Sequence, residues 1–114
     1  MKRTDFAGAL YRYFRDYLVN DRGCSARTIE TYRYAFIQFI DYMENHLNIR
    51  PEKIELTHIN VQNLQSFLLW LEREKKVSTS TRNQRLAAFK SFSSFLKYDL
   101  PECLDNVIQI QNIK

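Results

Sequence analysis

One segment near residue 80 carries side chains that are well suited to binding an anion. Ser78 or Ser80 can begin a helix, because a serine hydroxyl accepts a hydrogen bond from a free backbone N–H. Hydroxyl, amide and cationic groups follow, and residues 77–98 contain no Asp or Glu. A helix N-terminus already favours negative charge through its dipole and its free N–H groups. The segment therefore predicts a phosphate-binding helix end that uses Thr81, Arg82, Asn83, Arg85 and Lys90.

A second segment repeats part of this arrangement. The Ser-x-x-Thr spacing of residues 78–81 recurs at residues 25–28. Four residues after each threonine stands a side chain that can reach a phosphate, Tyr32 in the first segment and Arg85 in the second. Two such helix ends can hold two points of a nucleic-acid backbone, although Ser-x-x-Thr also occurs by chance at many helix starts.

The charge distribution supports this interpretation. The chain has a formal net charge of +4. Residues 22–34 carry a net charge of +2 and residues 72–90 carry +4, so the rest of the chain sums to −2. Positive charge concentrated in two places is typical of a nucleic-acid footprint. The alternative is an ordinary core helix with a solvated basic face.

Helices must position these groups, because apolar residues recur at helical spacing along most of the chain. Only two Gly and two Pro interrupt the pattern, which favours an all-α fold. Thr4 or Asp5, Ser25 and Asn60 are further N-cap candidates. The helices are expected at residues 4–20, 25–46, 60–75 and 78–98.

Two other segments have less regular patterns. Residues 49–60 form a connector whose Ile54, Leu56 and Ile59 are expected to pack on the core. In residues 102–114, isoleucines alternate with polar residues, which indicates a short strand, an extended tail or a frayed end.

Composition excludes several classes of protein. With 114 residues, 45% of them hydrophobic, the chain is expected to fold as one globular domain. It has neither an apolar run that could span a membrane nor an N-terminal signal pattern. Its two cysteines favour a reducing cytoplasm. Its two histidines are not paired at ligand spacing, and no glycine-rich phosphate loop is present, so we expect no metal or cofactor.

The two hydroxyl-rich segments resemble the core-binding, SAM-like domain of tyrosine recombinases and phage integrases. The first carries S-x-x-T-x-x-x-Y at residues 25–32. The second carries the more specific S-x-x-T-x-N-x-R-L-A-A-F-K-S-F-x-x-F-L at residues 78–96. The resemblance covers about residues 5–105. It implies a four- to five-helix, SAM-like orthogonal bundle over residues 1–101, with residues 102–114 as a tail or the start of an interdomain linker.

The resemblance also implies which residues meet duplex DNA. The second and fourth helices would approach the major groove and the backbone, with base contacts near their N-termini. Glu30 departs from the pattern, because it places an acid where phosphate is expected; it either reads a cytosine amino group or points away. The expected DNA-binding residues are Arg27, Thr28, Thr31, Tyr32, Ser80, Thr81, Arg82, Asn83, Gln84, Arg85 and Lys90.

The resemblance implies no catalysis by this chain alone. The family's catalytic domain uses arginines, histidines and a nucleophilic tyrosine, and it is longer than the residues after Pro101. The expected partners are duplex DNA, that catalytic domain in the same full-length chain, and neighbouring recombinase protomers. The expected location is the cytoplasm, on the nucleoid of a bacterium. The alternatives are a helix-turn-helix-like transcriptional regulator, a helical protein–protein interaction module and an RNA-binding domain.

Overall fold

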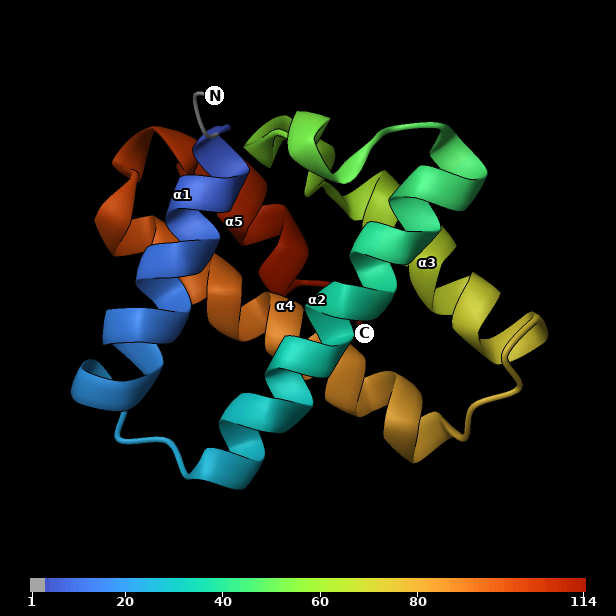
Figure 1. Cartoon of the computed structure of the whole chain (residues 1–114), viewed down its shortest axis with the longest axis horizontal. Helices are drawn as coiled ribbons and strands as arrows, with labels where there is room; N and C mark the ends of the chain where they lie inside the picture. Colours follow the sequence, from blue (N-terminus) through green and yellow to red (C-terminus); the bar gives the residue numbers. More distant parts are fainter. Residues whose placement is uncertain (1–3) are drawn as a thin grey trace. The chain divides into compact units, whose positions relative to one another are not determined.

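The computed structural model describes residues 4–114, except for the side chains of Asp21, Cys103 and Leu104. Within them lie five α-helices and no strand, so the all-α expectation is confirmed. The chain divides into two compact units that meet in sequence between His58 and Ile59. Figure 1 shows the α-helices in order: α1 (Asp5–Arg12), α2 (Ala26–Leu47), α3 (Val61–Arg73), α4 (Thr79–Asp99) and α5 (Leu104–Gln111). None of these described helices is long and apolar enough to cross a lipid bilayer.

The first helix changes its winding partway along. Thr4 caps α1 by accepting a hydrogen bond from the N–H of Ala7 at 3.2 Å. After α1 the chain continues as a π-helix, η1 (Tyr13–Asp21), whose wider turn has i→i−5 hydrogen bonds. The wider turn explains which residues are buried, because Leu18 lies five residues after the buried Tyr13. Tyr17, which lies four residues after Tyr13, is only half-buried.

The first unit pairs this helix with α2, which runs in the opposite direction (Figure 1). Phe14 meets Phe36 edge-on, with ring centroids 5.8 Å apart. At its C-terminal end, α2 stops at Asn48, which takes the left-handed conformation with φ 56°. The sequence predicted both ends of this helix to within one residue.

The connector after α2 contains two short 3-10 turns, η2 (Pro51–Lys53) and η3 (Leu56–His58). Ile54, Leu56 and Ile59 of this connector are buried, as expected. The Asp5 carboxylate accepts a hydrogen bond from the N–H of Leu56 at 2.8 Å and so ties the start of α1 to this connector.

The second unit begins at a predicted cap. Asn60 accepts a hydrogen bond from the N–H of Asn63 at 2.8 Å, and α3 follows. The next helix, α4, returns beside α3, with Phe67 and Phe89 edge-on and their ring centroids 5.8 Å apart. It ends at Asp99, two residues before Pro101.

The expectation of an extended or frayed segment at residues 102–114 is wrong. After a 3-10 turn, η4 (Pro101–Cys103), the chain forms α5, which packs along α4. Val107, Ile110 and Ile113 are buried at a spacing of three, whereas Ile108 is exposed. The isoleucine alternation concealed this helical spacing, because Val107 rather than Ile108 belongs to the buried face.

Candidate nucleic-acid interface

The two Ser-x-x-Thr segments begin α2 and α4 with nearly identical geometry. Ser25 has φ −66° and ψ 159°, and Ser78 has φ −70° and ψ 162°. In each helix the serine Oγ accepts from the N–H of the threonine three residues later, Thr28 or Thr81, at 3.1 Å. The same Oγ donates to the threonine Oγ1 at 3.0 Å and 3.1 Å. Both predicted caps are confirmed, and Ser80 is not the cap of α4.

These caps belong to a longer structural repeat, in which equivalent positions lie 53 residues apart, as from Ser25 to Ser78. In the turn before each serine, one residue has a positive φ, 58° at Gly23 and 52° at Lys76. In both turns, the next residue donates its N–H to a carbonyl six residues earlier. Cys24 donates to Leu18 at 2.9 Å, and Val77 donates to Leu71 at 3.2 Å.

The repeat extends into the helices on both sides of the turn. The edge-on pairs Phe14–Phe36 and Phe67–Phe89 are equivalent and have the same centroid distance, 5.8 Å. Each unit is therefore built around the same helical hairpin. Equivalent stripes run along its second helix, through Thr28, Tyr32, Ala35 and Phe39 in α2 and through Thr81, Arg85, Ala88 and Phe92 in α4.

In both helices the N-terminal turns extend beyond the buried residues. The first buried residue is Ala35 in α2 and Leu86 in α4. At a rise of about 1.5 Å per residue, about 13 Å of α2 and about 10 Å of α4 precede these positions. Neither first turn contains an acid. The two helix ends are thus accessible, and their backbone N–H groups favour an anion.

On each helix, the face that carries the buried Ala35 or Ala88 continues toward the N-terminus with polar residues. Thr28 and Tyr32 lie on this face of α2, on the N-terminal side of Ala35, and are half-buried. Thr81 and Arg85 occupy the equivalent positions of α4 and are also half-buried. The core-facing side of each helix therefore carries a threonine and a longer polar side chain on the N-terminal side of its buried alanine.

The other expected contact residues lie around these stripes. Arg27, Ser80, Asn83 and Gln84 are exposed, whereas Thr31 and Lys90 are half-buried. Thr31 donates its hydroxyl hydrogen to the carbonyl of Arg27 at 3.0 Å.

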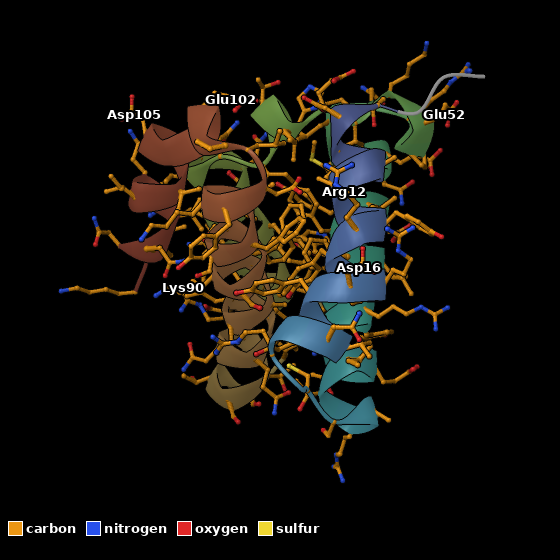
Figure 2. All side chains as sticks on the ribbon, turned by 90° about the vertical axis from the view of Figure 1, so that its left-hand side faces the viewer. Arg12, Asp16, Glu52, Lys90, Glu102 and Asp105 are labelled. Carbon is orange, nitrogen blue, oxygen red and sulfur yellow. The ribbon has the colours of Figure 1, made fainter. Side chains whose placement is uncertain are left out.

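Residues 80–85 cannot all face one side of α4. Six consecutive residues go more than once around a helix of about 3.6 residues per turn. Lys90 is turned by about 140° from Arg85 and lies farther along the helix. Figure 2 shows Lys90 about midway along α4. The structure thus brings Thr81 and Arg85 together and separates Lys90 from them.

Glu30 lies on the far side of α2 from the polar stripe. It stands about half a turn around the helix from the midpoint of Thr28 and Tyr32. Its carboxylate lies 3.9 Å from the guanidinium of Arg33, and both side chains are exposed. Of the two roles considered for this acid, the geometry favours the one in which it points away.

One contact near the second helix end was not foreseen from the sequence. Glu72, in the last turn of α3, has its Oε1 3.2 Å from Nε of Arg82 in the first turn of α4. The Arg82 side chain is only 18% exposed, and its Nη1 donates to Oδ1 of Asn83 at 3.1 Å. Glu72 precedes residues 77–98, which contain no acid, and the turn between α3 and α4 brings it close to Arg82.

Comparisons with known proteins agree with the resemblance seen in the sequence. The family described as "Phage integrase, N-terminal SAM-like domain" matches residues 12–99. An integrase/recombinase named y4rC, from Sinorhizobium fredii, is 30% identical over 112 residues, which are 98% of this chain and 33% of that protein. No solved structure matches the chain.

Two proteins named tyrosine recombinase XerC are also similar. The one from Herpetosiphon aurantiacus is 33% identical over 74% of this chain and 26% of its own length. The one from Roseiflexus sp. is 36% identical over 73% of this chain and 25% of its own length. The chain therefore spans between a quarter and a third of the length of these relatives. Since the family match covers most of the chain, the chain belongs to the SAM-like N-terminal domains of the phage integrase and tyrosine recombinase family.

Proposed function

We propose that this chain is the DNA-binding, non-catalytic part of a site-specific tyrosine recombinase. It grips one face of duplex DNA with the N-terminal ends of α2 and α4. Strand cleavage then belongs to a catalytic domain elsewhere in the full-length protein. The relatives named as recombinases are three to four times as long as their matched segments, which leaves room for such a domain.

The repeated hairpin is the observation that carries this proposal. Each copy presents a serine-capped helix end without an acid in its first turn, and each end extends beyond the buried core. A helix N-terminus stabilises an anion through aligned N–H groups and the helix dipole. Two such ends on one chain suit a ligand with regularly spaced phosphates, which duplex DNA is.

The side chains divide into two kinds of contact. Phosphates are expected to meet Thr28, Tyr32, Thr81 and Arg85, which share equivalent stripes. The exposed residues Arg27, Ser80 and Gln84, together with Thr31, flank these stripes and are placed to approach base edges or further phosphates. Lys90 lies farther along α4 and would contact DNA only if the duplex ran alongside the helix beyond its N-terminal turns.

Fluorescence anisotropy with a labelled duplex tests the proposal. The isolated chain should bind in the non-specific range of about 10⁻⁴–10⁻⁶ M at physiological salt, and its affinity should fall steeply as salt rises. Arg85→Ala should weaken binding and lower the slope of log K against log salt by about 0.9, because one phosphate contact is lost.

Lys97→Ala is the matched control. Lys97 is an exposed cation on the same helix, about 18 Å along the axis from Arg85. It should leave both the affinity and the salt slope nearly unchanged. Equal effects of the two variants would mean that binding follows net charge rather than the helix end, and affinity independent of salt would contradict a phosphate grip.

The same titration separates the alternative functions. Tighter binding to RNA than to duplex DNA would favour an RNA-binding domain. A dimer that protects a palindromic site would favour a helix-turn-helix-like regulator. Failure to bind any nucleic acid would favour a protein–protein interaction module.

A further inference from the structure

The turns of the two hairpins share a backbone conformation but fill it with different residues. The residue with a positive φ is Gly23 in the first turn and Lys76 in the second, at equivalent positions of the repeat. Glycine adopts this left-handed conformation readily because it has no Cβ, whereas the Cβ of another residue crowds the next carbonyl oxygen. The second hairpin therefore holds a lysine where the first shows that glycine is sufficient.

Polar contacts within the protein do not explain this lysine. Among the described residues, a Cβ added at Gly23 would meet nothing within 4 Å, so a side chain at this point of the turn enters open space. Lys76 is itself exposed. Within the part of the chain that the structure describes, its ammonium takes part in no ion pair or hydrogen bond. No such contact therefore offsets the unfavourable backbone conformation of Lys76.

Two cations close to Lys76 in sequence are already engaged. The Nε of Arg82 lies 3.2 Å from Oε1 of Glu72, and the Arg82 side chain is only 18% exposed. The ammonium of Lys75 lies 5.2 Å from the centroid of the Trp70 ring. The charge of Lys76 differs from both, because it remains available to a ligand.

The helix dipole offers an ordinary reason for a cation in this turn, since positive charge is favourable after the C-terminus of α3. The repeat shows that another position already meets this need. Arg22 and Lys75 are equivalent, and each directly precedes the residue with a positive φ. Lys76 is thus a second cation, added to the one that both turns share.

The position of Lys76 brings its charge to the start of α4. It precedes the cap Ser78 by two residues, so the Cα atoms of the two lie within about 7 Å of each other. The first turn of α4 contains no acid that would compete for the ammonium. A lysine is a flexible point charge and a common phosphate ligand. A phosphate held at this helix end is therefore within reach of Lys76.

We propose that Lys76 is a further phosphate contact, kept in the left-handed conformation at the expense of fold stability. This proposal rests on the proposed function and adds the turn before α4 to the contact surface. The two hairpins then grip DNA unequally. The second neutralises phosphates with Lys76 and Arg85, whereas the first has Gly23 and Tyr32 at the equivalent positions.

Lys76→Gly should have opposite effects on stability and on binding. Its melting temperature should rise by about 2–6 °C, because glycine relieves the left-handed backbone. Its affinity for a labelled duplex should fall about threefold to tenfold, and the slope of log K against log salt should fall by about 0.9, as for the loss of one phosphate contact. Lys76→Arg keeps the charge and should leave the affinity and the slope nearly unchanged.

Three control variants separate charge from backbone. Lys76→Asn removes the charge but tolerates the left-handed conformation, so it should weaken binding as much as Lys76→Gly does. Gly23→Ala adds a Cβ without charge at the equivalent position and should lower the melting temperature. Lys97→Ala removes an exposed cation far along α4 and should leave the affinity and the slope nearly unchanged.

The two assays overturn different parts of the account. A lower melting temperature in Lys76→Gly would mean that the lysine is kept for the stability of the α3 end and not for DNA. Unchanged affinity and salt slope in this variant, with a wild-type chain that binds duplex, would remove the contact and leave the proposed function intact. A wild-type chain that binds no duplex would overturn both.

Discussion

At the scale of single residues, the hydroxyl groups at the helix starts have separable roles. Ser78 accepts from the N–H of Thr81 and caps α4, whereas Ser80 is exposed within the first turn. Both serines were candidates for the cap, because either hydroxyl could precede the apolar stripe. Only the backbone conformation decides between them, since a cap requires extended φ and ψ at its own position.

Replacing these serines should therefore have unequal effects on stability. Ser78→Ala should lower the free energy of unfolding by about 1 kcal/mol, because an N–H of the first turn loses its acceptor. Ser80→Ala should change it by less than about 0.5 kcal/mol, as expected of a surface substitution. Urea denaturation measures both values. A larger loss for Ser80→Ala than for Ser78→Ala would contradict the assigned cap.

A pair of carboxyl groups predicts how stability changes with pH. A hydrogen bond to the Asp5 carboxyl, together with burial and the charge of Asp5, raises the pKa of Glu55 above its ordinary value of about 4.5. The folded protein then holds this proton more tightly than the unfolded chain does. The contribution of Glu55 to stability should fall as pH rises from about 4.5 through the raised pKa.

Glu55→Gln should remove this loss, so the variant should gain stability relative to the wild type as pH rises from 4 to 7. Glu44→Gln, an exposed acid on α2, is the control and should not change the pH profile. Thermal unfolding at a series of pH values measures the difference. Parallel profiles of the wild type and Glu55→Gln would show that the pKa of Glu55 is not raised in the folded protein.

At the scale of elements, α5 is a packed part of the second unit. Gln111 donates to the carbonyl of Lys90 at 2.7 Å and to Oγ of Ser93 at 2.6 Å. Ser93 is a buried polar residue, and it also donates to the Lys90 carbonyl at 2.9 Å. In Figure 2, Asp105 of α5 lies toward the C-terminal end of α4. These bonds join the end of α5 to the middle of α4.

Gln111→Ala should lower the free energy of unfolding by about 1–3 kcal/mol, because it removes a donor from partly buried acceptors. Gln109→Ala, at an exposed position of the same helix, should have little effect. Hydrogen exchange should show faster exchange of the α5 amides in Gln111→Ala than in Gln109→Ala. Equal exchange rates in the two variants would mean that Gln111 does not anchor the helix.

The sequence predicted the elements whose signals are local. The caps Ser25 and Asn60, and the approximate ends of α2, α3 and α4, follow from residue types that satisfy or interrupt backbone hydrogen bonds. The π-helix was not predicted, because Tyr17 and Leu18 are both apolar, so the sequence also fits the ordinary helical spacing. The expected contact residues themselves remain a prediction.

Tertiary contacts set the limit of that prediction. Glu72 and Arg82 are ten residues apart and belong to different helices, so no helical spacing relates them. The sequence showed only the Ser-x-x-Thr part of the hairpin repeat, for a similar reason. The two copies share few residue types, and their equivalence lies in backbone features such as the positive φ at Gly23 and Lys76.

At the scale of the whole molecule, the chain contains two copies of one hairpin with chemically different second helices. One helix end offers Thr28 and Tyr32, and the other offers Thr81 and Arg85. A duplex held by both ends at once requires the two hairpins to present them to the same ligand. The proposed grip is thus a property of the complete chain and not of either hairpin alone.

Amide chemical shifts followed during titration with a short duplex test this grip most directly. The account predicts that the largest changes fall together on residues 26–32 and 79–85, with little change in residues 104–113. Changes confined to one hairpin, or centred on α3 and α5, would contradict a grip by the two helix ends.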